Sequence, residues 1–496
     1  MRTFVLICSF LALLGSTSTA APPNVLFIAV DDLKPTLGCY GDIKAISKNI
    51  DQLARAGTVF LNNHCQQAVC GASRASLMTG QYPDTNGVRD FQTKMREARK
   101  NVLTLPQHFK NNGYQVVSMG KIYDGRCVDD WIKHDEPSWT ERLNPWPKSG
   151  VFKGYLNEKT VAKLRQIKNE FSQDASKLSE AMPPTEGSEE VPDEAYVDGA
   201  TAKAAVATLR KLTKKGQRPF FLAVGFDKPH LPFVAPKRYW DLFDRDEFDL
   251  ARVNRMPRRS PQWAGHGSGE LRYGYQVPKK GELSEELQRE LIHGYYACVA
   301  YVDAQIGKVL TELEKSGAAD NTIIAIWGDH GFHLGDHALW CKHSNFEQAT
   351  RSPLIIKAPG QKATGRKTQS PTEFIDIFPT LCDLAGLKIP NGLEGVTLRP
   401  ILDDADTSVK SLAQSQYDRI DWRNSDRKLM GYSYRGPRYR LTQWKEMSYK
   451  KGESDGPIVA EELYDYKTDP LETRNLIKDP RAAGPLKDMR EEVARR

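Results

Sequence analysis

The chain has 496 residues, of which 70 are Lys or Arg and 63 are Asp or Glu, so its formal net charge is +7. This length suits one large domain with a smaller one. The small positive excess fits an anionic substrate and equally a protein with no anionic partner, so it does not predict nucleic-acid binding. Beyond the N-terminal segment no stretch is apolar enough to cross a bilayer, which excludes stable membrane insertion.

The first twenty residues have the pattern of a secretory signal peptide. The chain starts Met1-Arg2, is apolar from Thr3 to about Leu14, and reaches the small residues 18–21. One positive charge, a short apolar core and small residues before a cleavage point are typical of such peptides. A membrane anchor is the alternative, but a span needs about 20 apolar residues. We therefore expect cleavage after residue 20 and an exported protein, either periplasmic or extracellular.

Between residues 21 and 406, short apolar β-rich runs alternate with helical patterns. The expected strands are 24–30, 115–119, 219–225, 322–327 and 353–357. The expected helices are 49–56, 105–111, 201–214 and 283–314. Strands that alternate with helices predict an α/β sandwich, with a largely parallel central sheet flanked by helices. We assign residues 21–406 to this domain.

The composition changes after about Asp406. Residues 429–444 predict a strand pair, residues 462–466 another strand, and a terminal helix follows. Residues 407–496 are therefore expected to form a smaller α+β domain with an antiparallel sheet. Two earlier stretches, 179–194 and 252–280, have no clear period: the first is expected to be a solvated loop, and the second either a lid or a surface loop.

Polar clusters follow four of the expected strands at the point where each strand ends. They are Asp31-Asp32, Gly120-Lys121, residues 227–230 and Asp329-His330. Ligands of such sheets bind beyond the carboxyl ends of the strands. We therefore expect these clusters to converge on one edge of the sheet.

Asp31, Asp32 and Asp329 offer up to six carboxylate oxygens. Adjacent carboxylates repel each other unless a cation neutralises them, which favours a hard divalent metal. Calcium or magnesium fits, whereas His330 is an unusual ligand for either and would also suit zinc. An isolated Asp-Asp pair is more often a cap or a solvated turn, but the addition of Asp329-His330 favours a metal.

Cys70 begins a short segment, Cys70-Gly71-Ala72-Ser73-Arg74, in which Arg74 lies one helical turn after the cysteine. A free thiol here fits a nucleophile, a metal ligand or half of a disulfide. Once Cys8 is removed with the signal peptide, six other cysteines remain, an even number that permits disulfides in an oxidising compartment. Those six are Cys39, Cys65, Cys127, Cys298, Cys341 and Cys382.

The segment at Cys70 resembles the maturation signature of the type I sulfatases, Cys-x-Pro/Ala-x-Arg followed by a short helix that ends in Thr-Gly. The resemblance covers nearly the whole mature chain and is closest to the iduronate-2-sulfatase group. It is carried by NVLFIAVDDLKPTLGCYGD (24–42), QQAVCGASR (66–74), FFLAVGFDKPHLPF (220–233), GDHGFHLGDHALWCKHSNF (328–346) and KLMGYSYRGPRYRLTQW (428–444).

This resemblance implies an alkaline-phosphatase-like fold and a sulfuric ester hydrolase. It implies that a formylglycine-generating or equivalent maturation enzyme oxidises Cys70 to formylglycine (3-oxoalanine), whose hydrate attacks the sulfur. The implied ligands of one Ca²⁺ ion are Asp31, Asp32, Cys70, Asp329 and His330. The residues implied to bind and activate the sulfate group are Arg74, Lys121, His230 and Lys342.

The implied substrate is a sulfated polysaccharide or oligosaccharide that carries a 2-O-sulfate on a uronic acid. Lys34 stands where the similar enzymes carry an arginine near the sugar, so it either contacts a carboxylate or is a solvated lysine. Two departures from the family pattern matter. Ala72 replaces the usual proline, so maturation would need a different or more tolerant partner. The histidine expected shortly after Lys121 is missing, and Asp124 or His134 is the candidate replacement.

Two other functions remain open at this point. A phosphatase or phosphonate hydrolase of the same superfamily is the nearest enzymatic alternative. A catalytically silent, glycan-binding homologue is the other, and the missing histidine after Lys121 is its only support.

Overall fold

The computed structural model describes residues 21–147, 152–171, 174–421, 424–447 and 456–496. The segment assigned to a signal peptide, residues 1–20, lies outside the described residues.

An eight-stranded sheet forms the centre of the large domain, with the strand order β13-β2-β12-β9-β1-β7-β4-β5. Its pairs β1·β7, β1·β9, β4·β7, β4·β5 and β2·β13 are parallel, and β12 runs antiparallel to both of its neighbours. The predicted largely parallel sheet is thus confirmed. Its strands are β1 (Asn24–Val30), β2 (Thr58–Phe60), β4 (Gln115–Gly120), β5 (Glu141–Leu143), β7 (Phe220–Phe226), β9 (Thr322–Gly328), β12 (Leu354–Lys357) and β13 (Arg366–Thr368).

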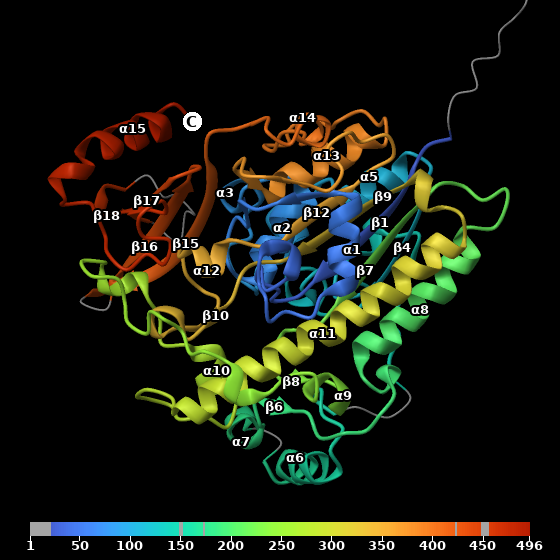
Figure 1. Cartoon of the computed structure of the whole chain (residues 1–496), viewed down its shortest axis with the longest axis horizontal. Coiled ribbons are helices and arrows are strands. Elements are labelled where there is room, and N and C mark those ends of the chain that lie inside the picture. The colour runs from blue at the N-terminus through green and yellow to red at the C-terminus, as the bar shows by residue number, and fades with distance from the viewer. Residues whose placement is uncertain (1–20, 148–151, 172–173, 422–423, 448–455) are drawn as a thin grey trace, which may run out of the picture.

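Helices cover both faces of this sheet (Figure 1). One face packs against α1 (Lys48–Ala56), α8 (Val197–Leu212) and α11 (Glu285–Lys315). The other packs against α2 (Cys70–Thr79), α5 (Leu105–Asn111), α13 (Ile377–Leu384) and α14 (Arg399–Asp403). Because alternate residues of a strand point to opposite faces, a strand covered on both sides must be apolar throughout, and β1 is.

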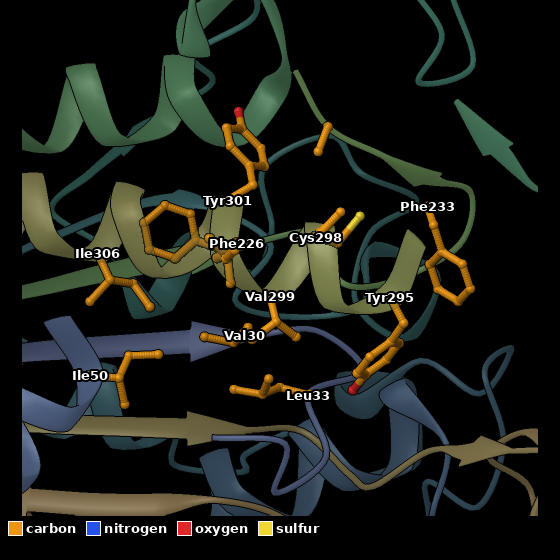
Figure 2. Packing of buried hydrophobic residues seen from close by; sticks show 14 of the residues in the cluster. Val30, Leu33, Ile50, Phe226, Phe233, Tyr295, Cys298, Val299, Tyr301 and Ile306 are labelled. Atoms are coloured by element: carbon orange, nitrogen blue, oxygen red, sulfur yellow. The ribbon is translucent and has the colours of Figure 1, made fainter. Parts of the chain in front are cut away.

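The long helix α11 packs across the strand ends of one face. Figure 2 shows Val299 of α11 close to Val30, the last residue of β1, and to Leu33 in the turn that follows. Tyr295 points toward the same turn, and its hydroxyl donates to the carbonyl of Asp32 at 2.7 Å. The helix therefore fixes the backbone that carries Asp32.

The remaining short elements connect these layers. The helices are α3 (Pro83–Asn86), α4 (Met95–Ala98), α6 (Glu158–Glu170), α7 (Ala175–Ala181), α9 (Lys237–Trp240), α10 (Gly269–Gly274) and α12 (Glu347–Thr350). The strand pairs are β3 (Asn63–His64) with β14 (Thr372–Glu373), β6 (Thr185–Glu186) with β8 (Phe233–Val234), and β10 (His333–Leu334) with β11 (Trp340–Cys341). The expectation of a solvated loop over 179–194 is wrong at β6, because β8 pairs with it and Glu186 is buried.

A four-stranded antiparallel sheet follows toward the C-terminus, as predicted, and lies to one side of the large domain (Figure 1). Met489 of the terminal helix α15 (Ala483–Ala494) packs on this sheet in one apolar cluster with Met430 and Leu441. The strands are β15 (Ala413–Asp421), β16 (Asn424–Arg435), β17 (Tyr439–Glu446) and β18 (Ile458–Asp465).

Candidate active site

Three carboxylates meet at the exits of β1 and β9. These strands pair in parallel up to Val30 and Gly328, so Asp31, Asp32 and Asp329 follow at the same edge. The backbone N–H of Asp32 donates to Asp329 Oδ1 at 2.9 Å, and all three carboxylates are fully buried. Asp32 has a φ of 57°, a left-handed conformation that aspartate tolerates better than most residues. Such strain is characteristic of functional sites.

Cys70 is the first residue of α2 and points its sulfur at this cluster. Its Sγ lies 3.4 Å from His330 Nε2 and 3.9 Å from Asp32 Oδ1. One ligand atom from each of Asp32, Cys70, Asp329 and His330 falls within 4.8 Å of the others. Burial, together with the charge of Asp31, raises the pKa of the Cys70 thiol well above its ordinary value. The raised pKa favours the thiol over the thiolate, which is the reactive form of cysteine.

Arg74 ties the cluster to the strand ends. Its guanidinium donates to Asp31 Oδ1 at 2.8 Å, to Asp329 Oδ2 at 3.0 Å and to the carbonyl of Lys121 at 2.6 Å. The side chain is fully buried, and its guanidinium stacks over Trp327 at 5.4 Å. Burial alone would raise the pKa of Asp31, but Lys121 and Arg74 outweigh it and hold that pKa well below its usual range. Arg74 thus helps to keep Asp31 ionised and holds both carboxylates in place.

Lys121 follows β4 and reaches the same cluster. Its Nζ donates to Asp31 Oδ2 and lies 4.0 Å from Cys70 Sγ. The preceding Gly120 has a φ of +66°, and a Cβ there would lie 1.8 Å from the carbonyl oxygen of Gly225. Only glycine fits this close crossing of two strand exits, which is what brings Lys121 into the site.

His230 and Lys342 lie on the other side of the cluster. Lys342 Nζ donates to both oxygens of Asp32 at 2.9 Å. His230 Nδ1 is 2.6 Å from the carbonyl oxygen of Leu231, which leaves Nε2 facing the site, 4.0 Å from Asp32 Oδ2. Burial lowers the pKa of His230, but the charges of nearby carboxylates, Asp32 first and Asp31 as well, outweigh it, and the net direction is upward. The raised pKa favours the imidazolium form.

Glu270 is a site residue that the sequence analysis missed. It lies on α10, inside the stretch 252–280 left open as a lid or a surface loop. Glu270 Oε1 lies 2.8 Å from Lys342 Nζ and 3.3 Å from His230 Nε2, and Oε2 lies 3.0 Å from His343 Nε2. Part of this stretch therefore covers the site. A stretch without periodicity gives no signal for such a residue.

Three further sequence candidates lie at different places. Lys34 is not brought to the cluster: its Nζ lies 3.6 Å from Asp336, and both residues line a separate cavity of about 290 Å³. Asp124 is buried and accepts from Arg126 Nε at 2.9 Å and Nη2 at 2.6 Å. Burial would raise the pKa of Asp124, but Arg126 outweighs it and keeps that pKa low. His134 lines a cavity that also contains Lys121 and His230.

The other cysteines contribute no cross-links. Among the described residues all seven cysteines are free thiols, so the even number left after Cys70 does not form disulfides. In the same part of the chain, no helix combines the length and apolarity needed to span a bilayer.

The sulfatase family profile matches residues 23–387, and that of the N-sulphoglucosamine sulphohydrolase C-terminal domain matches residues 335–496. Iduronate 2-sulfatase of Mus musculus is 34% identical, over 96% of this chain and 94% of its own. Delta 4,5-hexuronate-2-O-sulfatase of Bacteroides thetaiotaomicron is 28% identical, over 95% and 88% respectively. The chain therefore belongs to the sulfatase family, and it is an enzyme that hydrolyses sulfate esters.

Solved structures agree on the fold. A 2-O GAG sulfatase superposes with a TM-score of 0.67 at 24% identity, covering 95% of this chain and 91% of the other. The phosphonate monoester hydrolase of Agrobacterium radiobacter superposes with a TM-score of 0.71 at 25% identity, covering 95% of both chains. The alkaline-phosphatase-like architecture expected from the sequence is confirmed.

Proposed function

We propose that this sulfatase removes the 2-O-sulfate from a uronic acid in a sulfated carbohydrate, with a formylglycine at position 70 and one bound Ca²⁺. The observation that carries the proposal is the contact of Cys70 Sγ with a fully buried group of three carboxylates and His330. A formylglycine at this position does not depend on ionisation of a thiol, because its hydrate supplies the attacking oxygen.

The donor set fits a hard divalent cation. Asp31, Asp32 and Asp329 supply carboxylate oxygens from two adjacent strand ends, and His330 with position 70 completes the group. Calcium takes six to eight oxygen ligands in flexible geometry, which suits a site rich in carboxylates. Held by these residues, such a cation would act as a Lewis acid and would lower the pKa of a hydroxyl at position 70.

The protein side chains account for the remaining chemistry. Lys121 and Lys342 neutralise the non-bridging oxygens of the sulfate group, where negative charge builds up during its transfer. Arg74 holds the carboxylates and the start of α2 in a fixed relation. His230 Nε2, whose raised pKa favours the protonated form, gives a proton to the departing sugar oxygen.

The substrate class draws its support from relatives. The two curated enzymes named above are an iduronate 2-sulfatase and a hexuronate-2-O-sulfatase. A sugar contact for Lys34 stays a prediction, as does a base role for Asp124 or His134. We also propose, from the N-terminal pattern, that the protein is exported, and from Cys70 with Ala72 that it depends on a formylglycine-generating or equivalent enzyme.

Two measurements test the proposal. Sulfate release from 2-O-sulfated uronic acid disaccharides is measured for the wild type, Cys70→Ala and Cys70→Ser. Both variants are expected to fold, judged by thermal melting, and to lose turnover. Mass spectrometry of the peptide that contains residue 70 is expected to show the aldehyde, and a fully active preparation with an intact thiol would contradict the mechanism.

The phosphonate hydrolase neighbour defines the competing function. Turnover of 4-nitrophenyl sulfate is compared with that of 4-nitrophenyl phosphate and a phenylphosphonate monoester. A preference for either phosphorus ester would favour the alternative. Retention of sulfated oligosaccharide without sulfate release would instead favour a silent binding protein.

A further inference from the structure

A cavity of about 690 Å³ opens directly beside the sulfate-binding residues. Lys121 and His230 form part of its wall. Further lining residues come from the exits of β4, β5 and β7, the start of α8, the loops at 131–134 and 152–154, and α11. Its volume is in the range typical of small-molecule sites. A sugar whose ester contacts Lys121 and His230 would therefore extend into this space.

Arg142 is the unusual feature of the cavity wall. It lies on β5 opposite Ser118 of β4, and its Nη2 donates to the carbonyl of Gly120 at 2.7 Å. Its Nε and Nη1 are buried and find no hydrogen-bond partner among the residues that the structure describes. Burial lowers the pKa of Arg142 to about 10, so the guanidinium stays charged at neutral pH. Unpaired buried donors on a charged group are costly, and an anion in the cavity would offset that cost once the Arg142 side chain turns toward it.

Two neighbours on the same wall share this property. His134 Nδ1 and Thr201 Oγ1 are also buried without a partner among the described residues. Burial and the nearby charge of Arg142 lower the pKa of His134 to about 4, so the ring is neutral and offers one N–H. Three residues that line this cavity thus carry buried polar atoms without a partner among the described residues.

The wall also carries two carboxylates, Asp198 and Asp227. Both oxygens of Asp198 already accept backbone N–H groups, from Asp227 at 2.7 Å and Lys228 at 2.8 Å. Burial and the charge of Asp227 raise the pKa of Asp198 to about 7, which reduces its negative charge at neutral pH. Asp198 is therefore only about half ionised at pH 7, and the carboxylate whose charge acts on Arg142 is Asp129 instead.

Trp131 and Trp146 also line the cavity. Their side chains are 46% and 74% exposed, which is unusual for tryptophan. Exposed aromatic rings beside a pocket are suited to packing against the apolar C–H face of a sugar ring. The cavity therefore combines the exposed rings of two tryptophans with unpaired polar groups on Arg142, His134 and Thr201.

We propose that Arg142, assisted by His134, binds a second anionic group of the sulfated sugar while Lys121 and His230 hold the ester that is cleaved. The proposal rests on the proposed function and adds a residue that determines specificity. The second anion is a carboxylate or a second sulfate, since a guanidinium binds either by charge-assisted hydrogen bonds.

The test uses three methyl glycosides that share a 2-O-sulfate and differ only at carbon 6. Carbon 6 is the carboxylate carbon in the first, carries a sulfate ester in the second and carries a hydroxyl in the third. The kcat/KM for 2-O-sulfate release is measured for the wild type, Arg142→Gln and Arg142→Lys. Arg210→Gln serves as the matched control, because Arg210 is exposed on α8 and pairs with Glu312 at the surface. Thermal melting checks that each variant folds.

The wild type is expected to prefer an anionic substrate to the neutral one. In Arg142→Gln this preference falls by about 10- to 150-fold, the equivalent of losing one hydrogen bond to a charged group. The conservative Arg142→Lys restores part of it, and Arg210→Gln leaves it unchanged. Loss of the preference for the carboxylate or for the sulfate identifies the anion that is bound.

An equal loss of kcat/KM on all three substrates would overturn the role of Arg142, since a merely structural residue affects them alike. Such a result would leave the proposed function standing. Absence of sulfate release by folded wild-type enzyme from these substrates and from 4-nitrophenyl sulfate would overturn the proposed function itself, and the role of Arg142 with it.

Discussion

Glu270 Oε1 lies 3.3 Å from His230 Nε2, the atom that faces the candidate active site. The same carboxylate accepts from Lys342 and contacts His343. Burial would raise the pKa of Glu270, but Lys342 and His230 outweigh it and hold it well below its usual range. An anionic group thus already occupies the position between two residues proposed to meet the sulfate ester.

We therefore predict that Glu270 competes with anions for Lys342 and His230. Glu270→Gln keeps the size of the side chain and removes its charge. Inorganic sulfate, measured as a competitive inhibitor, is expected to bind about tenfold more tightly to this variant, the equivalent of one charge-assisted hydrogen bond of about 1.5 kcal/mol. Glu285→Gln, on the exposed first turn of α11, is the control. Unchanged or weaker inhibition in Glu270→Gln would show that the carboxylate does not compete.

Removal of calcium is expected to lower the melting temperature. A ligand present at about 100 times its dissociation constant stabilises the folded state by about 2.7 kcal/mol. Melting is measured in excess chelator and again after calcium is restored. In Asp32→Asn the calcium response should disappear, whereas in Asp241→Asn, an exposed aspartate on the surface, it should persist. A calcium response of equal size in Asp32→Asn would place the ion elsewhere.

Arg74 is expected to be essential for stability as well as for the site. Arg74→Met leaves Asp329 buried without this partner, and loss of one partner of a buried ion pair costs about 3–5 kcal/mol. Arg74→Lys keeps the charge but cannot donate to Asp31, Asp329 and two carbonyls at once, so its stability should lie between the wild type and Arg74→Met. Urea unfolding measures the order. A loss below about 1 kcal/mol in Arg74→Met would refute the structural role.

The central strands and the cluster at their ends could be predicted because each rests on a local signal. Residues 24–30 form one apolar run, and the structure begins and ends β1 at the same residues. Since strand exits converge on one edge, the polar residues after β1 and β9 could be expected to meet there, and the structure brings them together.

The edge strands and the position of Glu270 depend on contacts between residues far apart in the chain, and no local sequence pattern marks such contacts. The edge strand β13 has the sequence Arg-Lys-Thr and is largely exposed, so no apolar pattern marks it. Arg142 lies on β5, another three-residue strand without an apolar pattern. Glu270 reaches Lys342 only because α10 packs over the site, and residues 252–280 have no period that predicts this approach.

Asp198 provides a pH-dependent test of the packing beside the cavity. In the unfolded chain its pKa is about 3.9, whereas in the fold burial and the charge of Asp227 raise it to about 7. The folded state therefore binds the extra proton between these values, so the stabilisation from Asp198 is complete below about pH 4 and is lost as the pH rises through about 7.

The free energy of unfolding should fall between pH 5 and pH 8 in the wild type and fall less in Asp198→Asn. The asparagine oxygen still accepts a backbone N–H where the carboxylate did, and it does not titrate. Urea titrations at the two pH values give the comparison, with Asp241→Asn as the exposed control. An identical pH dependence in the wild type and in Asp198→Asn would mean that Asp198 keeps an ordinary pKa in the fold.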